Sequence, residues 1–157
     1  MTMLSKYFSL KELCVSSTAN RLGLNNIPTV GTQARKNLEM TAKKADIIRE
    51  AVKSAILVSS GYRAPAVNKA VGGVSNSAHV KGLALDIGSA EFSDVELFKL
   101  CQSLKKELNY DQLIIEYPER GASAWVHIGF VEEGKKPRGQ EFVISRVNKS
   151  LNYWLNK

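Results

Sequence analysis

The stretch "SNSAHVKGLALDIG", from Ser75 to Gly88, decides the fold and poses the main question about this sequence. It begins as a loop rich in Ser and Asn and ends in the apolar run "LALDIG", which predicts a buried strand. His79 is one of only two histidines in the chain, and Asp86 stands between Leu85 and Ile87. A lone carboxylate is costly to bury, so we expect Asp86 to have a charged or hydrogen-bonding partner.

The chain around this stretch predicts an α+β fold. Apolar residues at three- and four-residue steps predict a long helix from Thr32 to about Ser54, and a second amphipathic helix follows the N-cap Ser93. Ser9 and Glu12 have the spacing of a capping box and predict a short helix. Four further strands are expected at residues 55–63, 111–117, 125–131 and, as an edge strand, 141–147. This order of elements favours a mainly antiparallel sheet flanked by helices.

The length of 157 residues is that of one domain, and we expect a single domain over 1–157. Its core of motifs spans about 56–130, and the tail of about 140–157 is expected to pack back through Tyr153 and Trp154. Residues 20–31 and 118–124 are rich in turn formers and predict loops. No apolar run is long enough for a membrane span, and the first residues lack the pattern of a signal peptide. We therefore expect synthesis in a cytoplasm and no membrane partner.

The net charge of +7, from 22 Lys and Arg against 15 Asp and Glu, favours polyanionic partners: nucleic acid, anionic lipid or an anionic cell wall. The charges are scattered, so a solvated surface explains them equally well. No single element interleaves basic and aromatic residues, and we do not expect a nucleic-acid partner. Cys14 and Cys101 stand among apolar neighbours, which predicts reduced, packed thiols.

Histidine nitrogen and carboxylate oxygen are ligands that zinc prefers. In a strand over 125–131, His127 shares a face with Trp125 and Gly129, and Asp86 shares its face with Ala84. Taken singly, each residue has a commoner explanation, because strand histidines are usually just hydrogen-bonded and a lone Asp often caps a loop. The combination of both histidines with a carboxylate in an apolar run favours a metal site.

These residues also form a longer pattern. Ser77, His79, Gly82, Ala84 and Asp86 match the signature Ser-x-His-x-x-Gly-x-Ala-x-Asp, and Trp125 and His127 match a later Trp-x-His. With the SGYR element at Ser60–Arg63, the chain resembles the zinc peptidases of the D-alanyl-D-alanine carboxypeptidase group, which share a fold with lysostaphin and the hedgehog signalling domain. The resemblance covers roughly Phe8 to Phe130 and is closest to the short forms found in bacteriophages.

The resemblance implies that His79, Asp86 and His127 bind one Zn²⁺ and leave the fourth position for water, as in a catalytic site. Many relatives place an acidic general base three residues before the last histidine, where this chain has Ala124. Glu116 is the best substitute if residues 111–117 form a hairpin with 125–131 and bring it beside His127. Asp111 and Glu119 are weaker candidates. A plain structural role for Glu116, at an exposed strand end, stays open.

The resemblance also implies a substrate clamp at Arg63, because a guanidinium can bind a carboxylate with two parallel hydrogen bonds. Ser77, Gln112 and Tyr62 are the other candidates for substrate contact. Tyr62 and Asn68 are equally suited to holding their loop in place, and Trp125 is equally suited to packing.

The expected function is therefore zinc-dependent hydrolysis of stem peptides in bacterial peptidoglycan, either by an endopeptidase or by a D,D- or L,D-carboxypeptidase. The resemblance to phage forms favours an endolysin that waits in the host cytoplasm as a monomer until the membrane is permeabilised. The alternative is a zinc-bound phage structural or wall-binding module of the same fold with weak or no catalysis, which the alanine at position 124 keeps open.

Overall fold

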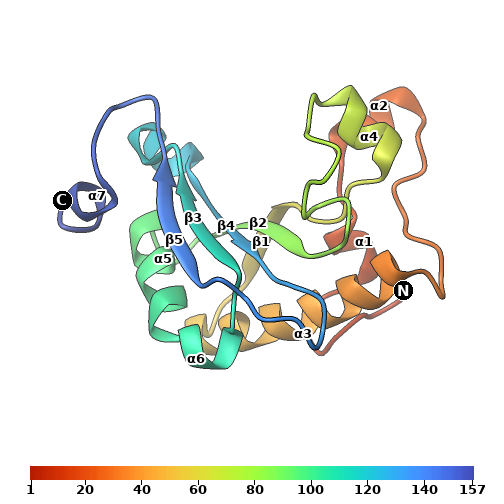
Figure 1. Cartoon of the computed structure of the whole chain (residues 1–157), viewed down its shortest axis with the longest axis horizontal. Coiled ribbons are helices and arrows are strands. Elements are labelled where there is room, and N and C mark those ends of the chain that lie inside the picture. Colours follow the sequence, from red (N-terminus) through yellow and green to blue (C-terminus); the bar gives the residue numbers. More distant parts are fainter.

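The computed structural model describes residues 1–157 as an α+β fold built on one five-stranded sheet (Figure 1). The strands lie in the order β1-β2-β4-β3-β5. Their bounds are β1 Ile56–Ser60, β2 Ala84–Ser89, β3 Gln112–Glu116, β4 Trp125–Gly129 and β5 Gln140–Ile144. Each strand overlaps a segment for which the sequence predicts one.

The sheet is mixed, which corrects one part of the prediction. The pairs β1–β2, β2–β4 and β3–β4 are antiparallel, but β5 pairs parallel with β3. β4 ends and β5 begins opposite Gln112, so the chain crosses the start of β3 between them. Arg138 fixes this crossing through its ion pair with Asp111, at 2.7 Å between Nη2 and Oδ2. The path of the connection decides the strand direction, and a strand pattern alone does not encode that path.

Three helices pack against one face of the sheet (Figure 1). They are α3 Gln33–Val52, α5 Asp94–Ser103 and α6 Lys105–Leu108. The predicted helix after Thr32 is confirmed, since Thr32 caps α3 and Lys53 ends it in a left-handed conformation. The second predicted helix has the expected capping box at Ser93 and Glu96 but breaks at Leu104 into α5 and α6. None of the helices combines the length and hydropathy that a bilayer crossing requires.

The N-terminal helices lie together at the end of the molecule far from β5 (Figure 1). They are α1 Leu10–Leu13 and α2 Ser17–Leu22, with α4 Pro65–Ala70 beside them. The capping box of Ser9 and Glu12 is confirmed in α1. The loop predicted over 20–31 is wrong at its start, because α2 extends to Leu22. The helical pattern in the sequence is short here, because Ser16 caps α2 and Gly23, at φ 66°, ends the helix after six residues.

At the opposite end, the tail forms α7 Leu151–Leu155 (Figure 1). Its Trp154 is buried, and Leu151 and Leu155 pack against the main core. The loop predicted over 118–124 contains a short 3₁₀ turn, η1 Pro118–Ser123.

The two faces of the sheet have opposite characters. Toward the helices, β2, β3 and β4 present only apolar side chains, each at most 1% exposed: Leu85, Ile87, Leu113, Ile115, Val126 and Ile128. The alternate residues point to the other face of the sheet, on which none of α3, α5 and α6 packs. They include Asp86, Glu116 and His127, so the strand period alone separates the core from the polar residues.

Candidate metal centre

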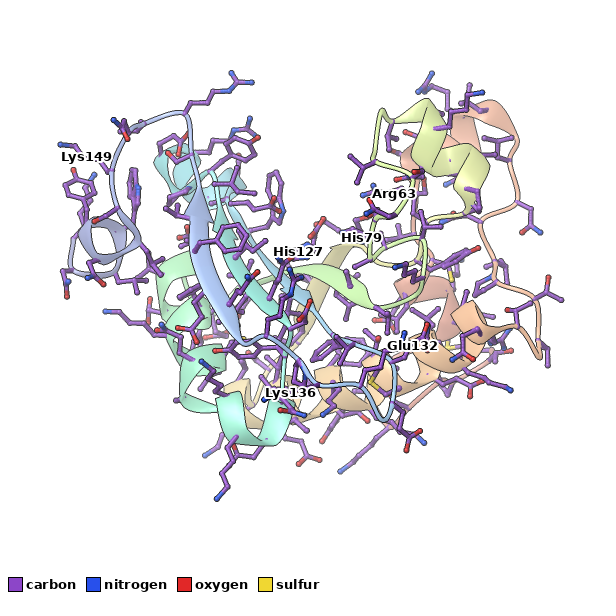
Figure 2. All side chains as sticks on the ribbon, viewed as in Figure 1. Arg63, His79, His127, Glu132, Lys136 and Lys149 are labelled. Carbon is purple, nitrogen blue, oxygen red and sulfur yellow. The ribbon has the colours of Figure 1, made fainter.

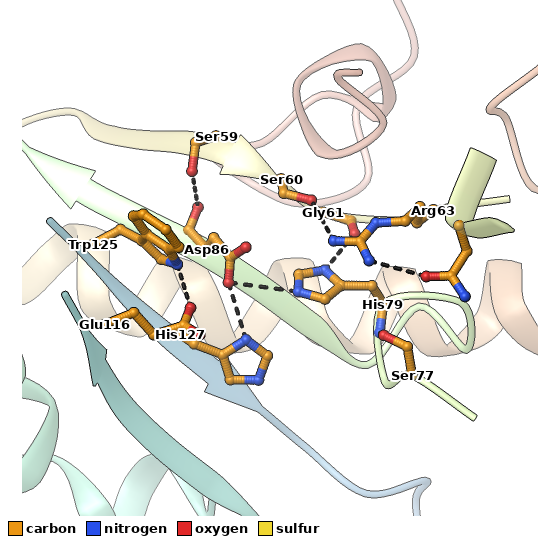
Figure 3. Close-up of polar contacts among 11 residues, drawn as sticks. Ser59, Ser60, Gly61, Arg63, Ser77, His79, Asp86, Glu116, Trp125 and His127 are labelled. Atoms are coloured by element: carbon orange, nitrogen blue, oxygen red, sulfur yellow. Dashed lines mark hydrogen bonds and ion pairs between the residues drawn. The ribbon is translucent and has the colours of Figure 1, made fainter. Parts of the chain in front are cut away.

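Two of the predicted ligands meet across neighbouring strands. Asp86 in β2 and His127 in β4 are paired in the antiparallel register. Directly opposed residues have Cβ atoms about 4.5–5.5 Å apart, so their side chains must interact. His79 approaches from the loop that precedes β2 (Figure 3). In Figure 2, His79 and His127 lie side by side between the strands and the part of the molecule that carries α2 and α4.

The distances suit a single ion. Asp86 Oδ1 lies 3.0 Å from His127 Nδ1 and 3.5 Å from His79 Nε2. The candidate ligand atoms of all three residues lie within 4.8 Å of one another. Ligand atoms about 2.1 Å from a tetrahedral zinc would be about 3.4 Å apart, which is close to the two distances from Asp86. The structure therefore brings His79, Asp86 and His127 together in a geometry that needs little change to hold a metal.

The orientation of His79 is fixed from behind. Its Nδ1 lies 2.8 Å from the carbonyl oxygen of Gly61. A carbonyl only accepts hydrogen bonds, so Nδ1 carries a proton, and in the neutral imidazole Nε2 presents a lone pair toward Asp86. The Ser77 hydroxyl accepts a hydrogen bond from the His79 backbone N–H at 3.2 Å. Such partners behind a histidine set its tautomer and ring direction in metal sites.

The charge of Asp86 supports a cation at this position. Burial on its own would raise the pKa of Asp86, but hydrogen bonds and charge from His127 and His79 outweigh it and lower the pKa to about 2. The residue is thus a buried carboxylate, 9% exposed. Without a metal, a proton on Nε2 of His79 supplies the hydrogen bond from His79 to Asp86. When His79 carries its proton on Nδ1 alone, Nε2 and the carboxylate oxygen are both acceptors and repel each other. A divalent cation between them satisfies both, and this donor set of two imidazoles and one carboxylate fits zinc.

Close backbone packing holds the two loops that carry the site. A Cβ on Gly61 would lie 2.2 Å from the carbonyl oxygen of Leu13, so only glycine lets this segment sit against α1 and present its own carbonyl to His79. Gly82, at φ 74°, packs against α3, where a Cβ would lie 2.4 Å from the carbonyl oxygen of Ala34. Thr41 then donates to the Gly82 carbonyl at 2.8 Å. The long helix therefore fixes the turn that leads from His79 into β2.

Glu116 lies where the predicted hairpin places it. β3 and β4 pair antiparallel, with Glu116 opposite Trp125 and Ile114 opposite His127. The indole Nε1–H of Trp125 donates a hydrogen bond to the Glu116 carboxylate (Figure 3). Burial, together with the negative charge of Asp86, raises the pKa of Glu116 despite the opposing effects of His127 and Trp125. A carboxylate with a raised pKa beside a metal site has the character of a general base.

The two weaker base candidates are engaged elsewhere. Asp111 accepts hydrogen bonds from the backbone N–H and the guanidinium of Arg138. This partnership lowers the pKa of Asp111. Glu119 accepts from the Ser145 hydroxyl and from the backbone N–H of Arg146, and so holds the end of β5. Asp111 lines the same cavity as Glu116 and His127, but Arg138 binds both of its oxygens.

Arg63 stands on the side of His79. Its Nη1 donates to Asn68 Oδ1 at 3.0 Å, and its Nη2 lies 3.5 Å from the Ser60 hydroxyl. No carboxylate lies within ion-pair distance of the guanidinium. The Arg63 backbone N–H donates to the His79 carbonyl at 3.1 Å, and this bond holds Arg63 against the loop that carries His79. Asn68 thus positions Arg63, a role that the sequence left open.

The remaining substrate-contact candidates divide into two groups. Ser77 and Gln112 line a cavity of about 490 Å³ that Glu116 and His127 also line. Tyr62 instead belongs to the hydrophobic core and is 8% exposed, and burial raises its pKa. Its position favours the structural role over substrate contact.

Asn26 is a site-supporting residue that sequence reasoning missed. Its Nδ2 donates to the carbonyl oxygens of Cys14 and Tyr62, and its Oδ1 accepts from the backbone N–H of Ala64. These three bonds hold the segment that carries Gly61 and Arg63. In the sequence Asn26 reads only as one more turn residue in "NNIP", so no signal marked it.

The comparison with protein families agrees with this geometry. Among curated proteins, none matches the chain significantly. The family model described as Peptidase M15 matches residues 6–128, which is most of the chain and includes all three candidate metal ligands, Arg63 and Glu116. M15 peptidases are zinc-dependent, and the donor set of His79, Asp86 and His127 fits that ion. The chain thus belongs to the M15 family of zinc metallopeptidases.

Proposed function

We propose that this protein hydrolyses peptide bonds in the stem peptides of bacterial peptidoglycan, and that it acts as a phage endolysin. The observation that carries the proposal is the position of Glu116 on the open face of the sheet, beside three convergent candidate ligands and along the same cavity as His127. A closed structural zinc site has four protein ligands, whereas this one has three, which is the pattern of catalytic sites.

A zinc ion held by His79, Asp86 and His127 would polarise the scissile carbonyl and acidify a water molecule. The side chains divide the remaining work. The Glu116 carboxylate accepts a proton from the attacking water, whose oxygen bonds to the carbonyl carbon. Glu116 then delivers that proton to the leaving amine nitrogen as the C–N bond breaks. Trp125 orients the carboxylate through its indole N–H.

Substrate recognition is proposed to begin at Arg63. Its guanidinium has no acidic partner and lies beside the His79 loop, so it can bind a carboxylate of the stem peptide with two hydrogen bonds. Ser77 and Gln112 border the cavity that Glu116 and His127 line, and they offer neutral polar contacts. The net charge of +7 favours approach to an anionic cell wall. A monomer released from the host cytoplasm after membrane permeabilisation is the form that we propose acts on the wall.

The decisive experiment measures both metal content and products. Purified protein should contain about one zinc per chain and should solubilise purified peptidoglycan, and a chelator should stop the reaction until zinc is restored. Mass spectrometry of the released muropeptides identifies the bond and separates an endopeptidase from a D,D- or L,D-carboxypeptidase. Protein that holds zinc yet releases no product at any pH would instead support the wall-binding module, which the alanine at position 124 leaves as the second candidate.

A further inference from the structure

Arg120 is a second arginine without an acidic partner near the site. It lies in η1, the turn that joins β3 to β4. Its guanidinium carbon stands 4.1 Å from the ring centroid of Tyr117 and 5.9 Å from that of Trp125. No ion pair joins it to any carboxylate, since the neighbouring Glu119 is bound by Ser145 and the Arg146 backbone.

The stacking partners connect Arg120 to the metal centre. Trp125 precedes His127 by two residues in β4, so the two side chains share the open face of the sheet. Its indole binds Glu116, and its ring lies 5.5 Å from that of Tyr117. Arg120 therefore covers the aromatic pair that borders Glu116.

Arg63 and Arg120 stand on opposite sides of the candidate ligands. Arg63 follows β1, and Arg120 follows β3, while β2 and β4 with Asp86 and His127 lie between those strands. Figure 3 shows Arg63 beside His79 at one side and Trp125 with Glu116 at the other, and Arg120 lies over the Trp125 ring. An extended peptide that crosses the centre from one side to the other would thus approach a guanidinium at each end.

The turn gives the Arg120 side chain a defined position. Tyr117 has the left-handed backbone conformation at φ 54°, which is uncommon for a bulky residue. Its backbone N–H donates to the Ile144 carbonyl at 2.7 Å, and the Arg120 N–H donates to the Tyr117 carbonyl at 2.9 Å. A guanidinium held over an aromatic ring can still donate its N–H groups to a carboxylate, and the contact with the ring reduces the entropy lost on binding.

We propose that Arg120 is a second carboxylate-binding residue, and that the preferred substrate is an acidic peptide with a carboxylate on each side of the bond that is cut. Arg63 binds one carboxylate and Arg120 the other, while the scissile carbonyl lies at the metal centre. This inference rests on the proposed peptidase function and adds a specificity to it: peptides with a carboxylate on one side only are poorer substrates.

The test uses synthetic stem tetrapeptides in which the α-carboxylate of D-glutamate and the C-terminal carboxylate of D-alanine are each free or amidated. Arg120→Gln should lower kcat/KM for the free diacid by about tenfold to a hundredfold, which is the range for loss of a hydrogen bond to a charged group. One of the two amidations should remove this difference between variant and wild type. Arg120→Lys keeps the positive charge without the planar guanidinium, so its kcat/KM for the free diacid should lie between those of the wild type and Arg120→Gln.

Arg49→Gln is the matched control. Arg49 also stacks on a tyrosine, at 4.7 Å from the Tyr7 ring, but it belongs to α3 on the covered side of the sheet. Its loss should leave kcat/KM and zinc content unchanged. Equal rates for Arg120→Gln and wild type on the diacid would overturn the proposal, and so would an equal loss on the free and both amidated peptides.

The proposed function and this specificity can fail separately. A zinc-loaded wild type that cuts none of the tetrapeptides would reject the peptidase function. Calorimetric binding of the same peptides would still test Arg120, whose replacement should weaken binding of the diacid by a similar factor. Unchanged binding would then reject the second carboxylate site as well.

Discussion

The covered and open faces of the sheet are made by alternate residues of the same strands, yet they serve different purposes. On β4, Val126 and Ile128 are fully buried beneath the helices, while His127 points to the open face between them. On β3, Ile115 is fully buried and its neighbour Glu116 lies beside the candidate metal centre. The packed apolar face holds the strands rigid. This rigidity fixes the positions of the candidate ligands on the other face, and no polar side chain has to enter the core.

This separation predicts that substitutions on the open face remove function and leave the fold intact, whereas substitutions on the covered face do the reverse. The apolar interior supplies most of the free energy of folding, and the open face adds a few polar contacts such as that between His127 and Asp86. Four substitutions test the separation.

The largest effect is expected for His127→Ala on the open face. One of three ligands is lost, so zinc binding and hydrolysis should both fall to background. The chelator-treated variant should still unfold cooperatively, at a lower denaturant concentration than chelator-treated wild type, because the buried Asp86 loses its hydrogen bond with His127. Metal analysis and peptidoglycan hydrolysis measure the first effect, and denaturation measures the second. Zinc retained at one per chain would show that the ligand set is wrong.

Glu116→Gln should separate catalysis from metal binding. The amide cannot accept the proton of the attacking water, so kcat should fall by about 10² to 10⁴, the usual contribution of a general base. Zinc content should stay at that of the wild type, because Glu116 is not among the three convergent ligands. A variant that keeps wild-type turnover would assign the base elsewhere.

On the covered face, Ile115→Ala should leave zinc content unchanged and lower the free energy of unfolding by about 2–5 kcal/mol, the cost of a cavity in a packed core. Ile144→Ala is the matched control on β5, where the side chain is 37% exposed. Its cost should stay below about 1 kcal/mol, as for surface substitutions. Equal costs measured by chemical denaturation would contradict the division into two faces.

Asp111→Asn should have the smallest effect and should also be pH-dependent. The ion pair with Arg138 lowers the pKa of Asp111, so its stabilising contribution is present above the ordinary pKa of about 3.9 and is lost as the pH falls through the lower folded value. At pH 7 the variant should be less stable by under about 1 kcal/mol, because the Arg138 partner is largely exposed. Unfolding curves near pH 7 and near pH 2 should show this difference shrink. A loss of turnover comparable to that of Glu116→Gln would instead make Asp111 the base.

Much of the fold and site could be predicted because local signals agree. The period of two places Asp86 and His127 on one side of their strands, and the period between three and four identifies α3. The site's supports were harder to find. Asn26 binds three backbone groups that are distant in sequence, and the Trp125–Glu116 hydrogen bond depends on a register that only pairing fixes. The parallel pairing of β5 depends on the crossing at Arg138 and Asp111, which no local pattern signals.

The sequence alone identifies the residues that we propose carry the chemistry: two histidines, one aspartate in an apolar run and a glutamate at a strand end. Chemical identity and strand alternation are local properties, so they can be read without the fold. The tertiary structure sets which of three carboxylates stays available, because Asp111 is paired with Arg138 and Glu119 is hydrogen-bonded by Ser145, partners 27 and 26 residues away. It also decided that two arginines from separate turns flank one centre. The long-range pairing of strands sets the distances among these residues in space, and no local propensity carries that information.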